Sequence, residues 1–139
     1  MRLQRDTNPS ENPMRMHKDD GKKKPTRYFS DKQEKAVARV IGGRQTANSG
    51  ATAYSKGDVT TGDRTGWLIE CKTKTSDCES ISVKKEWFDK NLSESIFMKK
   101  DYNAVVINFG PNSKNYYCID EQTFVEMKEA LDEKRMRGE

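Results

Sequence analysis

The segment at residues 67–72, Trp-Leu-Ile-Glu-Cys-Lys, carries the strongest β-strand signal in the chain. Side chains alternate along a strand, so Leu68, Glu70 and Lys72 share one face. Because the segment begins with apolar residues on both faces, we expect a central strand whose polar end emerges at a functional site. The acid and the amine of a Glu-x-Lys pair therefore stand together at the end of a buried strand.

The remaining sequence limits how large a core can surround this strand. Hydrophobic residues make up 32% of the 139 residues and charged residues 35%, so apolar side chains must be concentrated in a few elements. A chain of this length has room for one domain with one modest core. We expect that domain at residues 30–139.

Residues 1–29 carry eight basic and four acidic residues, and hence the whole net charge of +4. A charged segment so poor in apolar residues cannot offset its ordering entropy, so a flexible basic arm is expected. Its basic residues would attract DNA phosphates in a salt-sensitive manner. A solubilising tail is the alternative. The candidates for phosphate contact are Lys22, Lys23, Lys24 and Arg27.

The order of elements indicates an α/β fold. A capping box at Ser30 and Gln33 predicts the start of a helix that Gly42 and Gly43 end. Short strands are expected at 44–47 and 57–61, before the central strand, and two more at 103–109 and 116–119. Ser82 is expected to cap a long helix between the two groups of strands, and Asp120 a closing helix. Together these make a mixed β-sheet of about five strands flanked by helices. The apolar stripe expected to bury the long helix consists of Val83, Trp87, Phe88, Leu92 and Ile96.

Asp58 is the acid best placed to join the Glu-x-Lys pair, because a hairpin leads from it directly into the central strand. Two nearby carboxylates repel each other unless a cation neutralises them. Mg²⁺ would take oxygen atoms from Asp58, Glu70 and the Cys71 backbone carbonyl and keep several waters, and Mn²⁺ is the expected substitute. The cation would activate a bound water, which Lys72 would orient while offsetting charge in the transition state.

Glu34 is expected at the edge of the inward face of the first helix, three residues before Val37. It would accept a hydrogen bond from the water or help to hold a second ion. The bland alternative, a charge pair on a solvated strand face, remains open. His17, the only histidine, lies in the arm, so the core offers no histidine general base.

Taken together, these residues resemble the PD-(D/E)xK nuclease superfamily, and within it archaeal-type Holliday-junction resolvases and small phage proteins of that kind. The resemblance covers residues 30–131, with Gly57 where the family has its leading proline. It implies a restriction-endonuclease-like fold, magnesium dependence and hydrolysis of DNA phosphodiesters. The matching segments are Glu34, Arg44, Asn48-Ser49-Gly50, Gly57-Asp58-Val59 and Ile69-Glu70-Cys71-Lys72.

By position, the resemblance makes Asp58 and Glu70 the metal ligands, Lys72 the catalytic lysine and Glu34 the helix glutamate. It also implies that the segment from Arg44 to Ser49 contacts the DNA backbone. The residues concerned are Arg44, Asn48 and Ser49. The segment from 48 to 56 is longer than in compact archaeal members.

The expected function is a metal-dependent, structure-specific endonuclease that cuts branched DNA such as four-way junctions. Symmetric cutting needs two active sites, which favours a homodimer. A less selective nuclease for ends, flaps or foreign DNA, a non-catalytic nucleic-acid-binding module and a small scaffold domain are the alternatives. No run of 18 apolar residues predicts a membrane span, and we expect a cytoplasmic protein, in the host cytoplasm if a phage encodes it.

Overall fold

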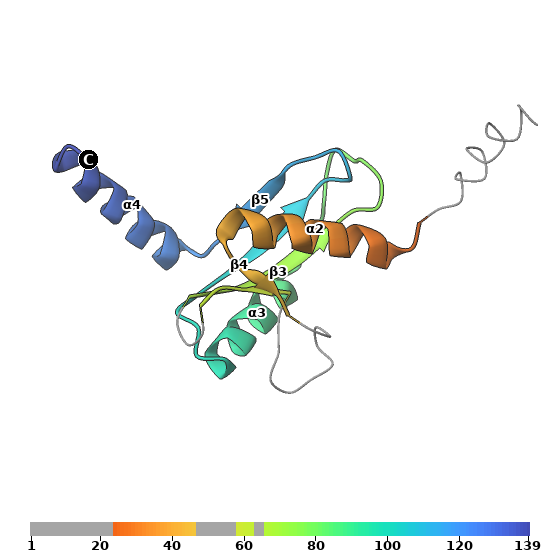
Figure 1. Cartoon of the computed structure of the whole chain (residues 1–139), viewed down its shortest axis with the longest axis horizontal. Helices are drawn as coiled ribbons and strands as arrows, with labels where there is room; N and C mark the ends of the chain where they lie inside the picture. Colours follow the sequence, from red (N-terminus) through yellow and green to blue (C-terminus); the bar gives the residue numbers. More distant parts are fainter. Residues whose placement is uncertain (1–23, 47–57, 63–65) are drawn as a thin grey trace, which may run out of the picture.

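The computed structural model describes residues 24–46, 58–62 and 66–139, which form three helices and a mixed sheet (Figure 1). Five strands lie in the order β1-β2-β3-β4-β5, and only β3 and β4 run parallel. The expected α/β fold with a mixed sheet of about five strands is thereby confirmed. Its elements are α2 (Thr26–Ile41), β1 (Arg44–Gln45), β2 (Val59–Thr60), β3 (Trp67–Thr73), α3 (Lys85–Phe97), β4 (Tyr102–Asn108), β5 (Asn115–Cys118) and α4 (Glu121–Met136).

β3 is the central strand, as its sequence predicts. It pairs with β2 on one side and along its whole length with β4 on the other. Leu68 and Ile69 are both buried although they point to opposite faces, because a helix covers each face. α2 packs its Val37 on the face that holds Ile69, and α3 packs on the face that holds Leu68 and Glu70.

The first helix begins earlier than the sequence indicates. α2 starts at Thr26, directly after Pro25, whose fixed backbone angle suits a helix start. Ser30 therefore lies inside the helix, where its hydroxyl donates a hydrogen bond to the Thr26 carbonyl at 3.3 Å. The expected capping box is wrong. The last four residues assigned to the arm, 26–29, belong to the helix.

The middle helix also departs from the expectation. It begins at Lys85 rather than after Ser82, and its buried residues are Asn91 and Ser95. The Asn91 amide donates hydrogen bonds to the carbonyls of Leu68, at 3.4 Å, and Ala104, at 3.0 Å. Because polar residues make the contact with the sheet, much of the expected apolar stripe stays exposed. Its exposed members are Val83, Leu92 and Ile96.

Two expected helix boundaries are confirmed. Gly42 ends α2 in the left-handed conformation, with φ of 69°, which glycine adopts without a steric penalty. Asp120 caps α4, because its carboxylate accepts a hydrogen bond from the Thr123 amide at 2.8 Å. Among the helices of the described residues, none is long and apolar enough to cross a membrane.

Candidate functional site

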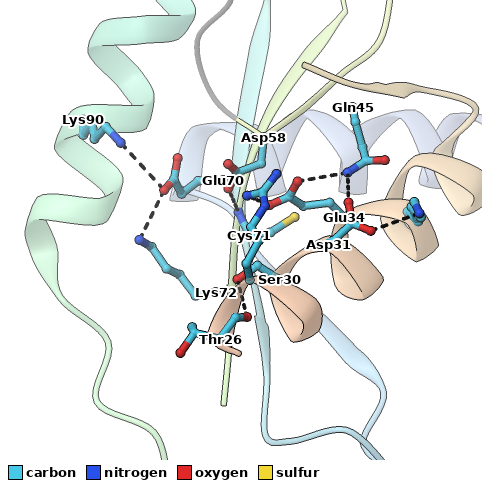
Figure 2. Close-up of polar contacts among 12 residues, drawn as sticks. Thr26, Ser30, Asp31, Glu34, Gln45, Asp58, Glu70, Cys71, Lys72 and Lys90 are labelled. Atoms are coloured by element: carbon cyan, nitrogen blue, oxygen red, sulfur yellow. Dashed lines mark hydrogen bonds and ion pairs between the residues drawn. The ribbon is translucent and has the colours of Figure 1, made fainter. Parts of the chain in front are cut away.

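Asp58 lies where the pairing of β2 with β3 ends. Figure 2 shows its side chain beside Glu70 and Cys71. Its amide donates to the Ile69 carbonyl at 2.9 Å, which continues the antiparallel ladder by one residue. Beyond that point its carboxylate replaces the backbone as the partner of β3, and Oδ2 accepts from the Cys71 amide at 2.7 Å. The side chain is thus fixed beside the polar end of the central strand, as the hairpin from Asp58 into the strand predicts.

Glu70 is the buried acid of the site. It is 5% exposed, and its Oε1 atom has no hydrogen-bond partner among the described residues. Burial raises the pKa of the Glu70 carboxyl, and the nearby charge of Asp58 raises it further. A buried carboxylate next to a second one is costly unless a positive charge compensates for it. The unpartnered Oε1 atom of Glu70 is therefore available to a cation.

Lys72 supplies part of the compensating positive charge. Its Nζ atom lies 3.3 Å from Glu70 Oε2, so the expectation that strand alternation brings the two together is confirmed. The same atom lies 5.0 Å from the centre of the Trp87 ring, a cation–π contact from α3. From the opposite face, the buried amide of Gln33 donates to the Lys72 carbonyl at 3.0 Å. Contacts on both faces thus hold the end of β3.

Glu34 approaches the same edge from α2 and is 3% exposed, which confirms its expected inward position. The Gln45 amide donates to Glu34 Oε1 at 3.1 Å, and Arg27 Nη1 lies 3.8 Å from Oε2. Burial raises the pKa of the Glu34 carboxyl, and Asp58 again adds to the shift. Asp58 therefore interacts with an acid from α2 and with an acid from β3.

The donor set fits a hard divalent cation. Within the described residues, no group of three or more His, Cys, Asp or Glu side chains is arranged as a metal site. Mg²⁺, however, binds through one or two carboxylates and keeps several waters. Asp58 and Glu70 supply two carboxylates, and the unpartnered Oε1 of Glu70 supplies an available oxygen. Burial and the charge of Asp58 together raise the pKa of Glu70, and a bound cation would offset both effects.

The Cys71 backbone is a further oxygen donor on the Asp58 side. The amide and the carbonyl of a strand residue point toward the same neighbour, and the Cys71 amide points at Asp58. The Cys71 carbonyl is therefore directed to that edge, as a metal ligand would need. Burial raises the pKa of the Cys71 thiol, which keeps the side chain itself neutral beside the acids.

The structure describes three of the residues expected to contact DNA. Arg44 is exposed on β1, and its guanidinium donates to the Gly62 carbonyl at 3.4 Å. Lys24 lies over the Tyr28 ring, with Nζ 4.3 Å from its centre. Arg27, assigned to the arm, is instead part of α2 and contacts Glu34. The others lie outside the described residues: Lys22, Lys23, Asn48 and Ser49.

Two site residues were not found from the sequence. Lys90 reaches from α3 to within 3.9 Å of Glu70 Oε2, and Gln45 bridges Glu34 and Asp31 from β1. The only signal for Lys90 is its spacing of three residues from Trp87, which puts both on one side of a helix. Gln45 gives no such signal, because its role depends on how β1 packs against α2.

Comparison of the chain with protein-family models, curated proteins and solved structures found no match.

Proposed function

We propose that this protein is a divalent-metal-dependent DNA nuclease of the PD-(D/E)xK type. One observation carries the proposal: the carboxylate of Asp58 is fixed against β3 beside Glu70, whose buried Oε1 has no partner in the described part of the chain. The Glu70–Lys72 contact at 3.3 Å completes the acid–acid–lysine set that the resemblance implies.

Each residue of the set has a role in hydrolysis. Asp58, Glu70 and the Cys71 carbonyl would hold Mg²⁺, which lowers the pKa of a bound water and polarises the scissile phosphate. Lys72 orients the water and offsets negative charge as the new P–O bond forms and the bond to the leaving oxygen breaks. Glu34 accepts a hydrogen bond from the water on the α2 side.

A binding module fits the site less well than an enzyme does. Phosphates approach a nucleic-acid-binding surface, and carboxylates clustered there would repel them. The buried acids also lower the stability of the fold, as their raised pKa values indicate. Such an arrangement is consistent with a cluster that serves chemistry.

The substrate and the assembly come from the resemblance. We propose branched DNA, with the four-way junction as the first choice and ends, flaps or foreign DNA as the alternative. A junction cut symmetrically needs two active sites, hence a homodimer. The protein would act in the cytoplasm, where it meets its DNA.

The test is cleavage of labelled four-way junctions and linear duplex in Mg²⁺, in Mn²⁺ and in chelator. We expect metal-dependent cutting, which Asp58→Asn and Lys72→Ala each slow by about 100-fold or more, as loss of a transition-state contact does. The matched controls, Asp101→Asn and Lys74→Ala, change exposed residues outside the site and should keep the rate. Tight binding without cutting in either metal, or cutting that persists in chelator, would overturn the proposal.

A further inference from the structure

α4 is exposed along almost its whole length. Thr123 is its only buried residue, and the helix projects away from the sheet (Figure 1). Its start is held by the Asp120 cap and by the Tyr102 hydroxyl, which donates to Glu126 at 2.8 Å. Isolated helices of about 15 residues are only marginally stable in water, because most helical stability comes from burying one face. The 16-residue helix therefore lacks the burial that a helix of this length needs.

α4 nevertheless has a face to bury. Phe124, Met127 and Leu131 follow one another at spacings of three and four, which places them in one stripe. Their exposed fractions are 58%, 46% and 65%. Three large apolar side chains in one row, each about half exposed, form a continuous apolar patch. Such a patch marks an interaction surface, unlike single apolar residues scattered over a surface.

The stripe continues into an apolar groove on the α2 face of the sheet. The groove has a volume of about 410 Å³, and Met127 is part of its wall. The stripe and the groove thus form one continuous apolar surface. The groove is lined by one polar residue, Thr61, and otherwise by apolar and aromatic residues: Ile41, Trp67, Ile69, Tyr117, Ile119 and Met127.

The charges beside the stripe are complementary to those of a second α4. Glu121, Lys128 and Arg135 are spaced by seven residues, so they lie along one edge of the stripe. An antiparallel second α4, with its centre between Met127 and Lys128, would place Glu121 opposite Arg135 and Phe124 opposite Leu131. A parallel second α4 would instead place the two charged edges on opposite sides of the pair, so Glu121 and Arg135 of the two copies would not meet. Lys128, near the centre, is already paired with Asp132 at 2.6 Å.

We infer that a second copy of this chain covers this surface, with the two α4 helices packed antiparallel about a two-fold axis. An isologous contact satisfies both stripes and both grooves at once. Each α4 is about 24 Å long at 1.5 Å per residue, long enough to form the centre of a standard interface of about 800 Å² per partner. The interface goes beyond the proposed cleavage chemistry and supplies the second active site that symmetric cutting needs.

The first test is the mass of the full-length protein by sedimentation equilibrium. We expect a dimer, and we expect Leu131→Glu and Phe124→Glu to convert it to a monomer that stays folded, with a lower unfolding midpoint because the contact no longer stabilises the fold. Met136→Glu is the matched control, because Met136 is 87% exposed on α4 and lies outside the stripe. A wild-type monomer at every accessible concentration, or a dimer that survives Leu131→Glu, would overturn the inference.

A charge exchange tests the antiparallel arrangement. Glu121→Arg and Arg135→Glu should each raise the dissociation constant by about 2- to 10-fold, as loss of exposed ion pairs does. The double variant should restore the wild-type value, because the pair is rebuilt in reverse. A double variant that dissociates more than either single variant would exclude the antiparallel contact.

The dimer and the nuclease chemistry can fail separately. Asp58→Asn should leave the dimer intact. The Leu131→Glu monomer should still cut one strand of the DNA substrate in Mg²⁺. A wild-type dimer that never cuts would overturn the proposed function alone, and a wild-type protein that cuts DNA but stays monomeric would overturn the interface alone.

Discussion

At the scale of single residues, the site depends on how Asp58 ends a strand pairing. Its amide still follows the ladder with Ile69, but its carboxylate takes over the next bond, to the Cys71 amide at 2.7 Å. The acid is therefore positioned by backbone geometry rather than by a flexible loop. A side chain fixed in this way can hold a cation without a large entropic cost.

Lys90 is expected to bind a substrate phosphate next to the site. Its side chain is 59% exposed, so Nζ can leave Glu70, 3.9 Å away, when a cation takes over that charge. Lys90→Ala should raise KM about 10-fold with a smaller change in kcat, because a contact made equally in ground and transition states affects binding. Lys85→Ala is the matched control, since Lys85 on the same helix is paired with Asp89. If steady-state kinetics gave the wild-type KM for both variants, Lys90 would not be a substrate-binding residue.

The sequence predicts those parts of the site that follow from local periodicity. Strand alternation joins Glu70 and Lys72, and helical spacing turns Glu34 inward, as the structure has both. Periodicity does not predict Lys90 and Gln45, because they reach the site through the packing of α3 and β1 against other elements. A contact of that kind depends on tertiary structure, which one sequence does not encode in a local pattern.

At the scale of elements, the order of helices and strands follows from the sequence, but two helix starts do not. Ser30 and Ser82 both look like caps, whereas Pro25 and Lys84 precede the helices. A serine before a helical stretch caps the helix only if the helix begins there. A proline further upstream can instead be the residue at which the helix begins.

α3 shows why an apolar stripe is an incomplete guide to packing. The buried side of the helix is formed by Asn91 and Ser95, and Asn91 bonds to carbonyls of β3 and β4. The polar contact turns Leu92 and Ile96 toward the surface.

The Asn91 contact should contribute measurably to stability. Asn91→Ala removes the donor from two buried carbonyls and should lower the free energy of unfolding by about 1–3 kcal/mol. Ser93→Ala, at an exposed position of the same helix, should stay within about 0.5 kcal/mol of wild type. Urea denaturation of the three proteins measures both values. Equal stability of the two variants would show that the Asn91 bonds do not anchor α3.

At the scale of the whole molecule, three elements distant in sequence meet at one edge of the sheet. α2 contributes Glu34, the residue before β2 is Asp58, and β3 contributes Glu70 and Lys72. The alternation of elements predicts the α/β fold, and the hairpin into β3 predicts that Asp58 lies nearby. The exposure of α4 could not be predicted, because an amphipathic pattern says that a face is buried and not what buries it.

The central claim is that the acids at this edge hold a divalent cation. The most direct measurement is an anomalous difference map from crystals of the full chain grown with Mn²⁺. We expect a peak within coordination distance of carboxylate oxygens of both Asp58 and Glu70, and no peak there in Asp58→Asn crystals. At saturating Mn²⁺, a map with no peak between these two residues would contradict the account.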